Sequence, residues 1–185
     1  MFRRSAALLT AVAALGLSAC GAESITSSSE PAESEALYLD LNGLKYQVQL
    51  SRQLNPALPE DGDYFRGIDQ SERFLPKGSV WFGVFIRVEN EYDRPIPSAR
   101  EFEIDDTRGN KFEPIDSEGV YAYQPETIPN RGYIPNQEDL QAYSGTQGSL
   151  LLFKIPLESL DNRPLELAIK DPSDTRKAVR VDLDV

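Results

Sequence analysis

The sequence predicts an all-β protein, built as an antiparallel β-sandwich of about seven to eight short strands. The first indication is a series of short segments in which apolar and polar residues alternate, as they do along a half-buried strand. The second is that Asn-Gly, Gly and Pro residues separate these segments. The third is that no long stretch has the apolar period of an amphipathic helix. Short strands of this kind bury their apolar faces by packing as two sheets.

Residues 37–54 predict the first hairpin. Two alternating segments flank Asn42-Gly43, the dipeptide that best tolerates the positive φ angles of a type I′ turn. After the turn, one face of the second strand carries the apolar side chains Leu44, Tyr46, Val48 and Leu50. Residues 55–79 contain several Pro, Gly and Asp and predict a long connection, with one helical turn around residues 71–74.

The middle of the chain predicts a central strand and a second hairpin. Residues 80–88, VWFGVFIRV, are apolar on both faces, as expected of a strand that is covered on both sides. Residues 100–115 alternate around Phe102 and Ile104, turn at TRGN and resume at Phe112 and Ile115. Residues 116–146 are predicted to be loop.

Three further strands complete the predicted sandwich. Residues 148–156, GSLLLFKIP, are again apolar on both faces. The segment LESLDNR then predicts a short turn or a single helical turn. Residues 165–170 and 179–185 alternate between apolar and polar and predict the last two strands.

The N-terminal residues predict an exported lipoprotein. Arg3 and Arg4 precede an uncharged run over residues 6–19, which is short for a permanent transmembrane helix and typical of an export signal. The run ends in LSACG, which resembles the lipobox of bacterial lipoproteins. This resemblance implies that residues 1–19 are a signal peptide and that the mature chain begins at a lipidated Cys20. The alternative is that Cys20, the only cysteine, is a buried thiol or half of an intermolecular disulfide.

The same resemblance determines the expected organisation and location. Residues 20–36 are rich in Ser, Glu and Ala and predict an acylated, disordered tether, and residues 37–185 predict one domain. We expect the protein at the extracytoplasmic face of the cell membrane, held through the lipid on Cys20, or at an outer membrane if the host has one. The formal net charge of −11 disfavours nucleic acid as a partner.

Several motifs in the second half of the chain follow one another in a characteristic order. A strand ends at Val88 and Asn90, a loop with two prolines follows, and a hairpin then carries Phe102, Asp106, Gly109, Phe112 and Pro114. The strands GSLLLFKIP and RPLELAI come next. This order resembles a widespread immunoglobulin-like family of bacterial lipoproteins of uncharacterised function, over about residues 80–170. The resemblance implies an immunoglobulin-like sandwich, and it implies no catalytic residue because the pattern contains none.

The amino-acid composition disfavours an enzymatic function. The sequence has no histidine, which excludes Ser-His-Asp and Cys-His catalysis and imidazole metal sites. With Cys20 lipidated, no free thiolate remains, and we expect no cofactor. An envelope hydrolase with paired carboxylates or a Ser-Lys dyad stays open as a second alternative, although no spacing supports it.

The carboxylate side chains leave calcium binding open as the first alternative function. Asp61, Asp63 and Asp69 lie in the Gly-containing segment PEDGDYFRGID, and calcium takes oxygen ligands of this kind. Their spacing does not follow the helix-loop-helix calcium pattern, and Asp beside Gly is ordinary turn chemistry. Both a turn role and a calcium-binding role of these residues therefore remain open, the latter in a calcium-stabilised surface structural protein.

Residues 120–145 exceed what a strand connection needs and form the predicted recognition loop. Tyr side chains offer a large contact area with a polar tip, and the prolines among them limit the entropy lost on ordering. The predicted recognition residues are Tyr121, Tyr123, Arg131, Tyr133 and Tyr143, with Arg131 at the tip. The alternative is that these tyrosines cover an open edge of the sandwich. We predict a lipid-anchored, non-enzymatic binding or accessory module for an envelope protein or glycan.

Overall fold

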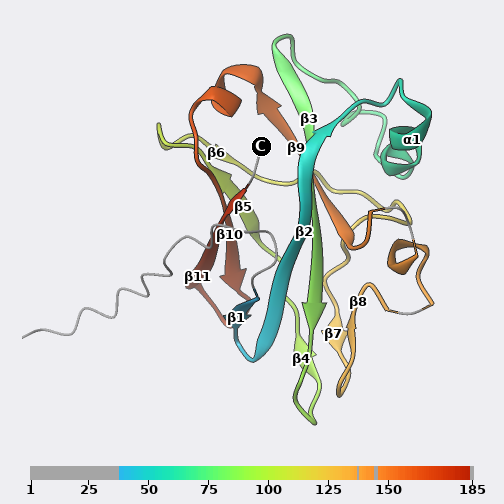
Figure 1. Ribbon diagram of the computed structural model, residues 1–185, viewed down its shortest axis with the longest axis vertical. Coiled ribbons are helices and arrows are strands. Elements are labelled where there is room, and N and C mark those ends of the chain that lie inside the picture. The colour runs from blue at the N-terminus through green and yellow to red at the C-terminus, as the bar shows by residue number, and fades with distance from the viewer. Residues whose placement is uncertain (1–37, 137, 144–145, 184–185) are drawn as a thin grey trace, which may run out of the picture.

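Two antiparallel sheets packed face to face form the body of the protein, in a computed structural model that describes residues 38–136, 138–143 and 146–183 (Figure 1). The described residues contain eleven strands, of which seven have three or more residues, so the predicted all-β sandwich is confirmed. The predicted signal peptide, Cys20 and the tether at 20–36 lie outside the described residues. Within the ranges given above, no helix has the length and apolar character needed to cross a membrane.

Five strands form the first sheet and four form the second. In the first sheet, β3 is central: it pairs with β2 on one side and with β9 and β8 on the other, while β1 pairs with β2. This sheet consists of β1 (Leu39–Leu41), β2 (Leu44–Leu54), β3 (Ser79–Glu89), β8 (Tyr133–Ile134) and β9 (Ser149–Pro156). The second sheet consists, in spatial order, of β11 (Asp174–Leu183), β10 (Leu165–Asp171), β5 (Phe102–Asp105) and β6 (Lys111–Phe112).

Short elements complete the chain. The strands β4 (Ile96–Pro97) and β7 (Thr127–Ile128) pair with each other. The helical elements are α1 (Pro59–Gly62) and the 3-10 turns η1 (Asp63–Phe65), η2 (Leu140–Ala142) and η3 (Leu157–Asp161). Residues 71–74, where one helical turn is expected, contain no assigned helix; hydrogen-bonded turns lie at residues 69–73, with the Glu72 N–H bonded to the Asp69 carbonyl at 2.9 Å and the Arg73 N–H to the Gln70 carbonyl at 3.3 Å.

The strand order is that of an immunoglobulin sandwich. The strands β2, β3 and β9 occupy the places of strands A, B and E, and β5, β10 and β11 occupy those of C, F and G. No fourth strand pairs with the outer edge of β9 in the part of the chain that the structure describes. The segment between β6 and β9 lies there instead, and it therefore determines what this side of the sandwich presents to solvent.

The first hairpin forms as predicted. Asn42 and Gly43 have φ angles of 51° and 81°, the left-handed pair that a type I′ turn requires. Leu41 consequently lies opposite Leu44, and both side chains are buried between the sheets.

A β-bulge in β2 places Leu50 on the face opposite to the predicted one. The register against β3 shifts between Val48 and Leu50, so that one extra residue is accommodated on β2. Leu44, Tyr46 and Val48 point between the sheets as expected, whereas Leu50 packs on the opposite face. The sequence pattern did not reveal the bulge because Gln49 continues the alternation without interruption.

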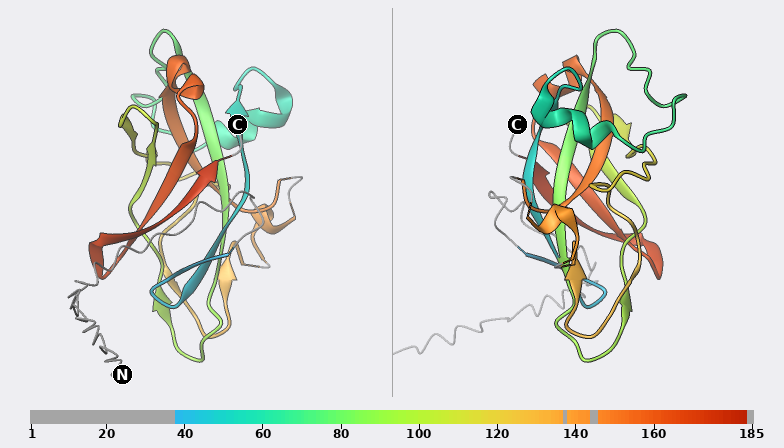
Figure 2. Two further views of the ribbon diagram at one scale, coloured as in Figure 1. Left: turned by 60° about the vertical axis from the view of Figure 1, so that its left-hand side comes forward. Right: turned by 90° about the vertical axis from the view of Figure 1, so that its right-hand side faces the viewer.

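The first sheet is apolar on both of its faces, as the sequence of β3 and β9 predicts. Its inner face packs against the second sheet in the main core, which includes Phe82, Phe153 and Ile155. Its outer face carries a second cluster that includes Trp81, Phe85 and Leu152. Figure 2 shows α1 and the connection from β2 to β3 on the outer side of the first sheet, opposite the second sheet. This connection supplies the cover that the outer cluster needs.

Asn90 joins the loops at one end of the sandwich. Its side chain is buried, and its Nδ2 donates hydrogen bonds to the carbonyl oxygens of Arg94 (2.7 Å), Ile128 (3.1 Å) and Pro129 (3.0 Å). Its Oδ1 accepts one from the backbone N–H of Tyr92 at 3.0 Å. One amide thus holds the loop after β3 against the strand pair β4 and β7.

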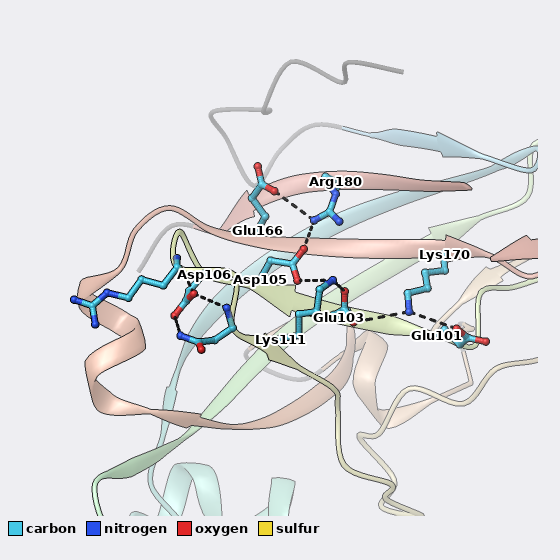
Figure 3. Close-up of polar contacts among 10 residues, drawn as sticks. Glu101, Glu103, Asp105, Asp106, Lys111, Glu166, Lys170 and Arg180 are labelled. Atoms are coloured by element: carbon cyan, nitrogen blue, oxygen red, sulfur yellow. Dashed lines mark hydrogen bonds and ion pairs between the residues drawn. The ribbon is translucent and has the colours of Figure 1, made fainter. Parts of the chain in front are cut away.

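Asp106 organises the turn between β5 and β6 (Figure 3). Its Oδ1 accepts hydrogen bonds from the backbone N–H groups of Arg108 and Asn110, both at 2.9 Å, and its Oδ2 accepts one from Asn110 Nδ2 at 2.7 Å. Burial acts to raise the pKa of Asp106. The hydrogen bonds from Asn110, Ser159 and Asn162 outweigh burial and hold the pKa well below its usual range.

We expect Asn90→Ala to lower the free energy of unfolding by about 2–4 kcal/mol, because a buried amide that joins three loop carbonyls, including that of the buried Ile128, is lost. Urea unfolding measures this change. Asn130→Ala is the matched control, since Asn130 is exposed in the neighbouring hairpin, and we expect a change within about 0.5 kcal/mol. Equal stability of the two variants would contradict the role of Asn90.

Asp106→Asn is expected to destabilise the protein in a pH-dependent way. The pKa of Asp106 is depressed in the folded state, so its contribution is complete above the unfolded-state pKa of about 4 and is lost as the pH falls below that value. The variant should lose about 2 kcal/mol at about pH 7 and less at about pH 3, as measured by urea unfolding. The control Asp161→Asn changes an exposed carboxylate. A loss that does not shrink in acid would refute the assignment.

Candidate binding cleft

Backbone hydrogen bonds hold residues 115–123 along the outer edge of β9. Ile115 N–H donates to the Leu152 carbonyl at 2.8 Å, and Tyr123 N–H donates to the Leu150 carbonyl at 2.9 Å. Leu150 N–H in turn donates to the Tyr121 carbonyl at 2.7 Å. The segment therefore satisfies the edge that an immunoglobulin D strand would otherwise occupy.

Two glycines let this segment meet the connection from β2 to β3. A Cβ atom added at Gly119 would lie 2.2 Å from the carbonyl oxygen of Arg66, and one at Gly67 would lie 2.3 Å from the backbone N of Gly119. Gly67 also has a φ of +86°. The Glu118 N–H donates to the Gly67 carbonyl at 3.0 Å across this contact. The crossing joins the two covering segments.

A cleft of about 790 Å³ lies between the two covering segments and the side of the sandwich. Its volume falls within the range of ordinary ligand pockets. Aromatic and aliphatic side chains contribute to its lining, including Phe102, Tyr123 and Leu151. The charged side chains that line it are Asp69, Glu72, Arg73, Arg100, Asp116 and Glu118.

The charges in the cleft divide into two groups. Glu72 Oε2 accepts a hydrogen bond from Lys154 Nζ at 2.7 Å, and Arg73 Nε donates to the Ile68 carbonyl at 3.2 Å, so these two side chains hold the cover in place. The others have no side-chain hydrogen bond or ion pair within the residues that the structure describes: Asp69, Arg100, Asp116 and Glu118. All of these are exposed.

Two buried tyrosines position the backbone next to Arg100. Tyr46 Oη accepts a hydrogen bond from the Ala99 N–H at 2.7 Å, and Tyr123 Oη donates one to the Ala99 carbonyl at 2.9 Å. Burial raises the pKa of Tyr46 to about 12, and it raises the pKa of Tyr123 further. Both hydroxyls therefore remain protonated donors or acceptors at physiological pH, and they clamp the residue that precedes Arg100.

The predicted recognition residues do not form one surface. Tyr123 is 7% exposed and packs edge to face on Phe102, with ring centroids 5.1 Å apart. Tyr121 packs in the same manner on Tyr64, at 5.1 Å. These two tyrosines cover the sandwich edge, which was the alternative reading of the segment. Tyr123 is thus buried and Tyr121 half-buried in this cover, because an apolar sheet edge needs side chains to cover it.

The other three predicted residues do lie at the surface. Arg131, with a φ of 54°, is at the tip of the turn between β7 and β8, where Nε donates to Asp93 Oδ1 at 2.8 Å. Tyr133 is half-buried on β8, and Tyr143 is 77% exposed. Tyr133 and Tyr143 share a small hollow, from which Arg131 is absent.

The predicted calcium residues are not brought together. Asp61 is buried and accepts hydrogen bonds from Arg52 at 2.6 Å and from the Asn55 N–H at 2.8 Å. Burial acts to raise the pKa of Asp61, but these hydrogen bonds outweigh it and lower the pKa. Asp63 pairs with Arg66 at 2.7 Å, and Asp69 lines the cleft. Among the described residues there is no group of three acidic side chains suited to a metal ion.

The outer face of the second sheet is charged but internally paired (Figure 3). Lys111 bonds to Glu103, and Lys170 lies 3.5 Å from Glu101. Asp105 and Glu166 lie opposite each other on neighbouring strands, where their like charges would repel, and Arg180 bonds to Asp105 and lies 3.4 Å from Glu166. This face is thus less suited than the cleft to bind a charged partner.

The cleft and its charges were not predicted from the sequence. Arg100 and Glu118 lie in connections that are far apart along the chain, and no spacing rule relates them. The one signal was the excess length of the two connections over residues 55–79 and 116–146.

Solved structures of low sequence identity resemble this fold. A candidate lipoprotein, ycdA, from Bacillus subtilis subsp. subtilis str. 168 matches with a TM-score of 0.52 at 14% identity, over 82% of this chain and 39% of that chain. The yjhA protein from Bacillus subtilis matches with a TM-score of 0.47 at 10% identity, over 80% of this chain and 97% of that chain. The chain matches no protein-family model and no curated protein sequence.

An uncharacterised β-sandwich protein from Clostridium difficile 630 also matches, with a TM-score of 0.41 at 7% identity, over 82% of this chain and 92% of that chain. At these identities the likeness concerns the fold alone, and the ycdA match is the one that supports it. This chain spans 39% of the length of ycdA.

Gly119→Ala is expected to loosen the cover over the outer cluster, because its Cβ would clash with backbone and not with a mobile side chain. We expect a loss of about 1–3 kcal/mol in urea unfolding and a red shift in the emission of Trp81, the only tryptophan, which is buried in that cluster. Gly62→Ala is the control, since nothing lies within 4 Å of its added Cβ. An unchanged Gly119→Ala variant would show that the crossing is not tightly packed.

Proposed function

We propose that this protein is a lipid-anchored, non-enzymatic binding module of the cell envelope, and that the cleft receives its partner. The observation that carries the proposal is a cleft of about 790 Å³ lined by charges that have no partner within the described residues. Glu72, by contrast, is paired with Lys154 and holds the cover in place. Charged side chains that line the cleft without such a partner are available to a ligand.

The partner class follows from the sign of those charges. Asp69, Asp116 and Glu118 give three negative charges, against two positive charges from Arg73 and Arg100, because the bond of Arg73 to a carbonyl leaves its charge in place. Apolar side chains lie between them in the lining. This combination suits an extended basic polypeptide segment, whose cations pair with the carboxylates and whose apolar side chains contact the floor. We therefore propose an envelope protein with a basic segment as the partner.

The location rests on the N-terminal sequence. The motif LSACG supports lipidation at Cys20, and the similarity to the ycdA fold is compatible with it. A flexible chain with the length of the tether predicted from the sequence has a root-mean-square reach of about 20–25 Å. The domain would then sample a shallow layer next to the membrane, where it meets partners that are anchored in the same membrane.

The test compares the anchored protein with a cleft variant that carries Asp69→Asn, Asp116→Asn and Glu118→Gln. The control variant carries Glu60→Gln, Glu158→Gln and Asp161→Asn, which neutralises three exposed carboxylates outside the cleft. Each protein is purified from crosslinked native membranes. We expect a partner that the native and control proteins enrich and that the cleft variant loses by at least about tenfold.

Two outcomes would count against the proposal. If the cleft variant retains the same partners as the control, the cleft is not the binding site. If the native protein enriches no partner at all, the protein is not an envelope binding module of this kind. Cys20→Ala tests the anchor separately, since loss of membrane retention is the expected result.

A further inference from the structure

The outer face of the first sheet changes character along its length. Beyond the bulge, Leu50 and Phe85 belong to the covered apolar cluster. On the side of the bulge nearest the Asn42-Gly43 turn, the outward positions of β2 and β3 are polar and half-buried. We call this part the polar face, and it consists of Lys45, Gln47, Gln49, Arg87, Glu89 and Tyr133.

Strand pairing brings these side chains side by side. Gln47 lies opposite Arg87, Lys45 lies opposite Glu89, and Glu89 lies opposite Tyr133. Gln49 Nε2 donates a hydrogen bond to Gln47 Oε1 at 2.6 Å. Planar amide, guanidinium and carboxylate groups therefore form a continuous row across three neighbouring strands.

Tyrosines mark both ends of this row. Tyr38, which precedes β1, is 46% exposed, and its ring centroid lies 5.8 Å from Lys45 Nζ. Tyr133 on β8 lies beneath the Arg87 guanidinium at 4.9 Å. From β1 to β8 there are three strand spacings, which is about 14 Å. The row is thus as long as a short oligosaccharide.

A hollow of about 200 Å³ adjoins the row at its β8 end. It is lined by Arg87, Tyr133, Pro135, Tyr143 and Gly148, among others. The Tyr143 ring is 77% exposed beside it. The hollow can accept one ring-sized group between an exposed aromatic side chain and a fixed guanidinium.

The charges on the polar face are already balanced. Arg87 Nε lies 2.7 Å from Glu89 Oε1, and Lys45 Nζ lies 2.9 Å from Glu91 Oε2. A ligand with a net charge would have to displace one of these ion pairs and would gain little. A neutral ligand with many hydroxyl groups can hydrogen-bond to the outer edges of the same planar groups without breaking them.

We propose that the polar face binds a neutral glycan, which lies across β1, β2, β3 and β8 with one sugar in the hollow beside Tyr143. The C–H face of the sugar packs on the exposed tyrosine ring, and its hydroxyls bond to Arg87, Glu89 and Gln47. This inference goes beyond the proposed cleft function, because the polar face and the cleft share no lining residue. Failure of one therefore leaves the other intact.

The test uses the full mature chain and titrates it with neutral oligosaccharides built from glucose or N-acetylglucosamine, three to six sugars long, by calorimetry. We expect Tyr143→Ala and Arg87→Gln each to weaken binding by at least about tenfold. The matched controls are Tyr92→Ala and Arg94→Gln. Tyr92 is another exposed tyrosine outside the polar face, and the Arg94 guanidinium lies 5.9 Å from its ring centroid. The controls and the cleft variant should bind as the native protein does.

Three results would overturn the proposal. The first is a dissociation constant above about 10 mM for every oligosaccharide in the set. The second is equal binding by Tyr143→Ala and Tyr92→Ala. The third is loss of binding in the cleft variant, because the glycan would then occupy the cleft. Tyr143→Ala keeps the test valid even if Arg87→Gln unfolds, since the Tyr143 side chain is largely exposed.

Discussion

The structure depends on one constraint: the first sheet is apolar on both faces, so both must be covered. The second sheet covers the inner face, as in any immunoglobulin-like sandwich. The outer cluster around Trp81 and Phe85 needs a second cover, which the long connections after β2 and after β6 supply. They meet where Gly67 and Gly119 allow backbone to approach backbone. The cleft is the space that remains between this cover and the sandwich edge.

A single extra residue in β2 divides the outer face of the first sheet. Before the bulge, outward positions are polar and half-buried, whereas after it Leu50 and Phe85 belong to the covered apolar cluster. A strand without the bulge would turn Leu50 toward the main core, because side chains alternate between the faces of a sheet. The bulge therefore separates a region that stabilises the fold from one that is available to a ligand. Bulges elsewhere often have the same role beside functional sites.

Both proposed surfaces use parts of the fold that an immunoglobulin-like sandwich does not need for its core. The cleft lies where a D strand would pair with β9, and the polar face lies on the sheet surface below the cover. Function in such folds belongs to the surfaces added to the sandwich and not to the sandwich itself. This is consistent with a likeness to ycdA that concerns the fold alone, at 14% identity.

The sequence by itself determined the all-β class, the Asn42-Gly43 hairpin, the central strand and the hairpin around TRGN, because these depend on local turn chemistry and on apolar alternation. Only the tertiary structure decided that Tyr123 is a buried clamp while Tyr143 is exposed, since both lie in one loop with similar neighbours. It also decided that Leu50 packs in the outer cluster, and it placed Arg100 and Glu118 in the lining of one cleft. Burial and long-range proximity depend on how the whole chain packs, and local sequence carries no information about that packing.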